Sequence, residues 1–115
     1  MAQTPEGKVT AKIKDVLKRE GIQFSMPSQT GYGIVGILDF ICCRPGGRYL
    51  AIEAKAPGKR NNTSTNQKVQ LFDIREVGGD GIVVDDVQQL EDYLNGCYQE
   101  SSGEKKIYEG DWSKT

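Results

Sequence analysis

Histidine is absent from this sequence, and its absence removes several kinds of active site. A Ser-His-Asp or Cys-His nucleophile, a histidine general base and a histidine-ligated zinc site are all excluded. Carboxylate, lysine, amide and hydroxyl groups are left for catalysis. These groups suit hard cations such as Mg²⁺, which are usually held by one or two carboxylates together with a substrate phosphate.

Long apolar runs and paired cysteines are missing as well. No stretch approaches the roughly 20 apolar residues of a membrane helix, and the opening MAQTPEGKVT has no apolar core of a secretory signal. Cys42, Cys43 and Cys97 are an odd number at spacings that fit neither a disulfide framework nor a zinc site. We therefore expect a cytoplasmic protein with reduced, structural cysteines and no membrane partner.

The 115 residues, of which 37% are hydrophobic, suffice for one domain with a modest core. We expect a single domain over residues 1–98 and a polar C-terminal extension over 99–115. The net charge is −1, but residues 44–75 hold seven basic and two acidic groups, whereas residues 76–115 hold three and ten. The basic segment is either a solvated surface or a site for a polyanion.

Helical and strand patterns alternate along the chain. The capping and periodicity signals predict, in order, a helix over 5–20, a short strand over 22–26, strands near 37–43 and 48–55, a helix over 65–77, a strand over 81–85 and a last helix capped by Asp86. This order is typical of an α/β domain with a mixed sheet, in which the first strands are antiparallel and the last is reached by a helical crossover.

The middle two strands should form a hairpin around the turn RPGGR, residues 44–48. That turn pairs residues from its ends outward: Cys43 with Tyr49, Ile41 with Ala51, Asp39 with Glu53, and Ile37 with Lys55. Because side chains alternate across a sheet, one face of the hairpin is uniformly apolar, carrying Leu38, Phe40, Cys42, Leu50, Ile52 and Ala54. The acids Asp39 and Glu53 lie together with Lys55 on the other.

Two carboxylates facing each other need an explanation, because opposed like charges destabilise a sheet and raise a pKa. A divalent cation between Asp39 and Glu53 would remove the repulsion, and Lys55 would offset part of the charge. The alternative is a surface cluster on an edge hairpin. Flanking runs that are apolar on both sides favour central strands instead.

Two further polar residues have two interpretations each. Glu6 falls on the apolar stripe of the first helix and is either a third acid of the site or a complement to the helix dipole. Gln67 fits the capping box S-x-x-Q that begins at Ser64, and it is either a cap alone or a cap that also serves a site.

These residues carry a resemblance. A first-helix glutamate, G-x-x-D at Gly36–Asp39, E-x-K at Glu53–Lys55 and Gln67 at the start of the next helix resemble the PD-(D/E)xK nuclease superfamily, and within it the VRR-NUC group of small nucleases. The match spans roughly residues 5–95. Leu38 stands where the family usually has proline. The resemblance implies a restriction-endonuclease-like αβββαβ core.

The resemblance also implies roles for individual residues. Asp39 and Glu53 would bind one or two Mg²⁺ or Mn²⁺ ions, with the Ala54 carbonyl as a further ligand and Glu6 as an acid of the metal shell. Lys55 would position the attacking water, and Gln67 would be an orienting amide. The expected activity is metal-dependent endonucleolytic hydrolysis of DNA.

The DNA contacts are expected outside the catalytic cluster. Lys59, Arg60 and Lys68 would hold flanking phosphates, while Tyr32 would either stack on a base or simply cover its loop. Small members of the resembled group often cut four-way (Holliday) junctions as dimers, and we expect a homodimer that acts on branched DNA. Two other classes remain open: a catalytically silent nucleic-acid-binding module of this fold, and a small adaptor domain that binds no nucleic acid.

Overall fold

A computed structural model describes residues 4–27 and 37–97 of the chain. Tyr32, Gly36 and the expected C-terminal extension 99–115 lie outside the described residues. The elements in chain order are α1 (Pro5–Arg19), β1 (Gln23–Ser25), β2 (Phe40–Arg44), β3 (Arg48–Ala54), the short 3₁₀ helix η1 (Arg60–Asn62), α2 (Thr65–Glu76), β4 (Asp80–Val84) and α3 (Val87–Leu94). Apart from η1, which was not predicted, this is the predicted order of elements.

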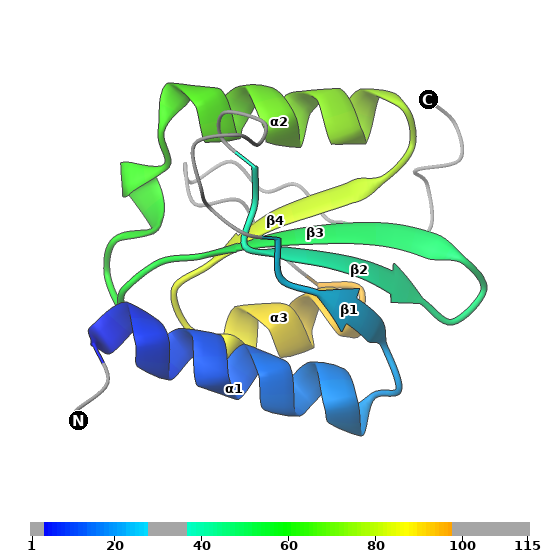
Figure 1. Ribbon diagram of the computed structural model, residues 1–115, viewed down its shortest axis with the longest axis horizontal. Helices are drawn as coiled ribbons and strands as arrows, with labels where there is room; N and C mark the ends of the chain where they lie inside the picture. Colours follow the sequence, from blue (N-terminus) through cyan, green and yellow to red (C-terminus); the bar gives the residue numbers. More distant parts are fainter. Residues whose placement is uncertain (1–3, 28–36, 98–115) are drawn as a thin grey trace.

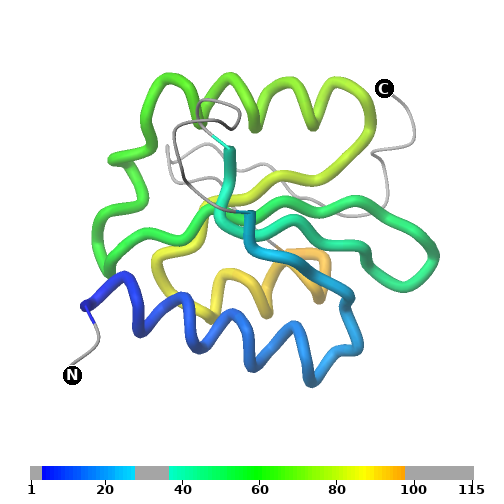
Figure 2. The backbone as a smooth tube through the Cα atoms, in the orientation of Figure 1, coloured from blue at the N-terminus to red at the C-terminus, as the bar shows by residue number. Residues whose placement is uncertain are grey.

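The strands form one mixed sheet in the order β1-β2-β3-β4. The pairs β1–β2 and β2–β3 are antiparallel, and β3–β4 is parallel. The helix α2 covers one face of the sheet, while α1 and α3 lie side by side on the other (Figures 1 and 2). The prediction of a mixed α/β sheet is confirmed, and β2 and β3 are its central strands rather than an exposed edge.

Helices α1 and α2, which both begin on the left side of Figure 1, carry strong start signals. Thr4 caps α1 by accepting the Gly7 N–H, and Pro5 occupies the first turn, where its missing N–H is no loss. At α2, Ser64 and Gln67 form the reciprocal capping box that the sequence predicted. These caps fix where α1 and α2 begin, and the candidate site lies between those two helix starts and the end of β3.

The core has two parts, one on each side of the sheet. The larger packs α1 and α3 against β2, β3 and β4, and its most deeply buried members include Ile13, Leu17, Phe40, Leu50, Ile52, Ile82 and Leu90. The smaller lies under α2 and consists of Leu38, Ala51, Leu71 and Val83. Close packing under α2 also explains Gly81, because a Cβ there would lie 2.8 Å from Leu71 Cδ2.

The predicted hairpin register holds from the turn up to Phe40, which pairs with Ile52. It was wrong beyond that point, because β2 starts at Phe40 and neither Asp39 nor Ile37 joins the ladder. The Asp39 carboxylate accepts the Ala54 N–H at 2.9 Å, so a side chain replaces the next backbone acceptor. The strict alternation of side chains ends there, and Leu38 packs in the core under α2 instead of beside Phe40.

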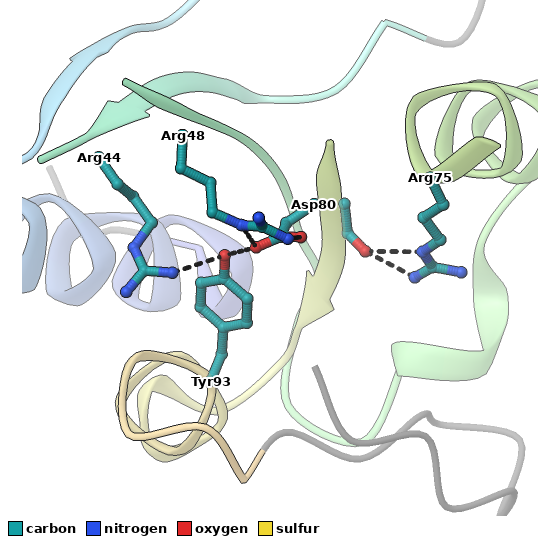
Figure 3. Close-up of polar contacts among 6 residues, drawn as sticks. Arg44, Arg48, Arg75, Asp80 and Tyr93 are labelled. Atoms are coloured by element: carbon teal, nitrogen blue, oxygen red, sulfur yellow. Dashed lines mark hydrogen bonds and ion pairs between the residues drawn. The ribbon is translucent and has the colours of Figure 1, made fainter. Parts of the chain in front are cut away.

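A buried polar network stabilises the end of the sheet at which β3 and β4 begin (Figure 3). Asp80, 1% exposed at the start of β4, accepts two hydrogen bonds from Arg48, at 2.9 and 2.7 Å, and one from the Tyr93 hydroxyl. Arg44 donates to the same hydroxyl at 3.0 Å, and its guanidinium carbon lies 5.0 Å from the centre of the Tyr93 ring. The network thus joins β2, β3, β4 and α3.

Candidate active site

The polar cluster is built on a strand end and a helix start. Glu53 and Lys55 are at the C-terminal end of β3, and Gln67 is in the first turn of α2. The Gln67 amide donates to Glu53 Oε2 at 2.7 Å, and its carbonyl oxygen accepts from Lys55 Nζ at 3.0 Å. Lys55 Nζ also lies 3.4 Å from Glu53 Oε2. Gln67 therefore restrains both the Glu53 carboxylate and the Lys55 ammonium group.

Gln67 serves the helix cap at the same time. Its side-chain oxygen accepts the Ser64 N–H at 3.1 Å, and the Ser64 hydroxyl accepts the Gln67 N–H at 3.2 Å. The sequence left open whether Gln67 is a cap alone or a cap that also serves a site, and in the structure it contacts both the cap and the polar cluster. Because the cap restrains the Gln67 side chain, its contacts with Glu53 and Lys55 are restrained too.

Glu53 is a buried acid with one unsatisfied oxygen. The residue is 4% exposed, yet Oε1 has no hydrogen-bond partner, whereas buried polar atoms are nearly always paired. Burial, followed by the negative charge of Asp39, raises the pKa of Glu53 from 4.5 to about 7, and the Lys55 charge opposes this only in part. In the absence of a bound metal ion, Glu53 is therefore only partly ionised near neutral pH.

Asp39 is the second acid of the cluster. Burial raises its pKa, while the Ala54 N–H and the charge of Lys55 act in the opposite direction. The negative charge of Asp39 in turn raises the pKa of Glu53. Two neighbouring carboxylates, one of them with an unpaired buried oxygen, are a donor set that fits a hard divalent cation.

Glu6 is placed differently from these two acids. It is exposed in the first turn of α1, although Val9 and Ile13 of the same stripe are buried. Its negative charge contributes to the raised pKa of Glu53, so its field reaches the cluster. Within residues 4–27 and 37–97, however, no three acidic or cysteine side chains are grouped closely enough to hold a metal ion. The two acids Asp39 and Glu53 are thus the core of the candidate metal site.

The three basic residues expected to contact DNA differ in their surroundings. Lys59 and Lys68 are exposed near the cluster, Lys59 in the loop after Lys55 and Lys68 directly after Gln67. Arg60 is half-buried, and its Nε donates to the Val83 carbonyl at 3.1 Å. Arg60 is adjacent to Lys59 in the sequence, but the Arg60 side chain packs onto β4.

Asp85, a buried acid directly after β4, was not predicted from the sequence as part of this region. Its carboxylate accepts backbone N–H groups from Gly58 and Arg60 in the loop that follows Lys55. A signal was present, because an acid that ends an otherwise apolar buried strand needs hydrogen-bond donors. No local pattern shows that a loop about 25 residues earlier in the chain supplies them.

A scan of protein-family models found no match to this sequence, and a search of curated protein sequences found none either. A search of solved structures found a chain described as "VRR_NUC domain". Its TM-score is 0.65 at 23% sequence identity, and the alignment covers 84% of this chain and all of the other. The chain has a VRR-NUC-like fold.

The VRR-NUC fold accounts for the mixed sheet with helices on both faces, and it confirms the restriction-endonuclease-like architecture expected from the sequence. At this level of identity the likeness concerns the fold, whereas any activity must be argued from the site itself. No helix among the described residues is both long and apolar enough to span a membrane.

Proposed function

We propose that this protein is a metal-dependent endonuclease that hydrolyses phosphodiester bonds of DNA. The observation that carries the proposal is the buried, unpaired Oε1 of Glu53 in the same cluster as Asp39. A carboxylate oxygen in such a place is stabilised by a cation. The VRR-NUC-like fold supports a nuclease in general, and the charged residues around the cluster support a polyanionic substrate.

In this proposal Asp39 and Glu53 hold Mg²⁺ or Mn²⁺, with the Ala54 carbonyl as a further ligand and Glu6 adding negative charge from α1. When bound, the ion would supply charge neutralisation at the phosphate and would lower the pKa of a water molecule. Gln67 keeps Glu53 oriented as a ligand. Lys55, restrained by Gln67, orients the attacking water and stabilises the negative charge that develops on the phosphate.

The substrate side of the proposal rests on exposed positive charge. Lys59 and Lys68 bind phosphates that flank the scissile bond and thereby position the DNA without reading its sequence. The expected substrate class is branched DNA, including four-way junctions.

The test is a cleavage assay with purified protein on a supercoiled plasmid, a linear duplex, a flap and a four-way junction. We expect cleavage that requires Mg²⁺ or Mn²⁺, is abolished by EDTA and is fastest on the branched substrates. Salt-sensitive DNA binding without cleavage in either metal would contradict the nuclease proposal and indicate a binding module. Absent or salt-insensitive binding would indicate a protein that does not act on nucleic acid at all.

We further propose that the protein acts as a homodimer through α2. Val69 and Phe72, one helical turn apart, are 50% and 61% exposed, so α2 has apolar side chains on its outer face as well as its inner one. A two-fold axis would bury the same patch on both copies. Two active sites in one assembly are what the symmetric cutting of a four-way junction requires.

Light scattering after size-exclusion chromatography tests this assembly. We expect a dimer for the wild-type protein and a monomer for Phe72→Glu, because burying a carboxylate between two apolar patches is costly. Met26→Glu is the matched control, since Met26 is also an exposed apolar residue, at 42%, but is not on α2. A monomeric wild-type protein, or a Phe72→Glu variant that stays dimeric, contradicts the proposal.

A further inference from the structure

The loop between β3 and α2 connects the two halves of the candidate active site. It leaves Lys55, forms a turn over residues 56–59 and ends at Ser64. The Lys59 N–H donates to the Ala56 carbonyl at 2.9 Å, and Gly58, at φ +80°, takes the left-handed position of this turn. Pro57 precedes it at the position that favours a fixed φ. The turn is therefore well specified by its own residues.

Asp85 attaches this turn to the sheet. Its Oδ2 accepts the N–H groups of Gly58 and Arg60, at 3.1 and 3.2 Å. Its Oδ1 accepts the Gln89 amide at 2.7 Å, and its own N–H donates back to the Gln89 side chain at 2.9 Å. Asp85 is 9% exposed, so these charge-assisted bonds are largely shielded from water. The loop is thus linked through Asp85 to the first turn of α3.

Two adjacent basic residues of this loop face different surroundings. Arg60 turns to the sheet, because its Nε donates to the Val83 carbonyl and its own carbonyl accepts the Thr63 hydroxyl. Lys59 remains exposed. The same Asp85 oxygen that holds Arg60 N–H holds Gly58 N–H, so the two residues on either side of Lys59 are fixed while its side chain is left in solvent.

From this geometry we infer that Asp85 is a positioning residue for DNA binding: it fixes the backbone on both sides of Lys59, so that this lysine contacts a phosphate beside the active site. Arg60 contributes by anchoring the loop to β4. An ordered loop loses less conformational entropy when the lysine meets its phosphate, which favours binding. The inference rests on the proposed function, since it names a determinant of the same DNA-binding surface.

The salt dependence of DNA binding tests the inference. The slope of the logarithm of the association constant against the logarithm of the salt concentration is negative, and its magnitude decreases by about 0.9 for each phosphate contact that is lost. We expect Lys59→Ala and Asp85→Ala each to reduce the magnitude of the slope by about this amount, and the double variant to reduce it no further than Lys59→Ala alone. Asp86→Ala is the matched control: it removes the same charge from the neighbouring residue, which caps α3 but makes no bond to the loop, and its slope should stay near the wild-type value.

The inference would be overturned if the two reductions in slope magnitude added up in the double variant, or if Asp85→Ala kept the wild-type slope. A wild-type protein whose binding does not depend on salt would instead overturn the proposed function, so the two failures are distinguishable. Amide hydrogen exchange on the free wild-type protein gives a second measurement that needs no variant. We expect the Gly58 and Arg60 amides to exchange at least about tenfold more slowly than in an unstructured peptide; unprotected amides at these positions would also overturn the inference.

Discussion

Glu53→Gln is expected to reduce DNA cleavage by about a thousandfold or more while leaving the fold intact. The variant keeps the shape of the side chain and an acceptor for the Gln67 amide, but it removes the negative charge that the proposed cation requires. Loss of several kcal/mol of metal-derived stabilisation corresponds to a rate loss of this size. Nicking of a supercoiled plasmid in Mg²⁺ measures it. Asp15→Asn, which changes an exposed carboxylate of α1, is the control that should retain wild-type turnover.

The same variant should increase stability in the absence of metal. The pKa of Glu53 is raised from 4.5 to about 7 in the folded protein. The folded state therefore binds more protons than the unfolded state between these two values, so the free energy of unfolding decreases as the pH rises from about 4.5 to about 7 and then levels off. Above pH 7 the ionised Glu53 destabilises the fold by up to ~3 kcal/mol. Glutamine carries no such charge.

Urea unfolding in EDTA at pH 5 and pH 8 measures this effect. Between these pH values the wild-type protein should lose stability that Glu53→Gln retains, and Mg²⁺ should restore stability to the wild-type protein alone. If Glu53→Gln is less stable than the wild-type protein at pH 8, or cleaves at a rate near that of the wild type, Glu53 is not an ionised metal ligand.

The parts of the fold that follow local rules were predictable from the sequence. Caps at Thr4 and Ser64 and the turn at residues 44–48 act over a few residues, and they set the helix starts and the hairpin register. From that register came the placement of Glu53 and Lys55 on one face, and the cluster around Gln67 follows from it. Short-range signals were sufficient here because the turn determines which residues of β2 and β3 are paired.

The departures have a common cause, which is competition by side chains for backbone or long-range partners. The Asp39 carboxylate takes the Ala54 N–H and ends the ladder, so that Leu38 moves under α2. No pattern in the sequence indicated that the Nε of Arg60 donates to the Val83 carbonyl, 23 residues away in the chain. Hydrophobic periodicity contains no information on such contacts, because it describes which face a residue takes and not which polar group it meets there.

Asp80 is the most deeply buried charged residue that the sequence did not indicate. No pattern in the sequence marked it, yet it accepts bonds from Arg48 and Tyr93 and is 1% exposed. Asp80→Ala should destabilise the protein by about 3–5 kcal/mol, because it removes the buried carboxylate that accepts hydrogen bonds from both the Arg48 guanidinium and the Tyr93 hydroxyl. Urea unfolding measures the loss. For a domain whose total stability is of order 5–15 kcal/mol, the expected change is large.

Two comparisons separate the loss of the ion pair from a general disturbance of the core. Arg48→Met/Asp80→Leu removes both charges and fills the space with apolar side chains, so it should recover much of the stability lost in Asp80→Ala. Arg48 and Glu53 stand about 17 Å apart along β3 at ~3.3 Å per residue, so any Asp80→Ala protein that remains folded should cleave DNA at the wild-type rate. A destabilisation below ~1 kcal/mol, or a double variant no more stable than Asp80→Ala, would show that the network does not hold this end of the sheet.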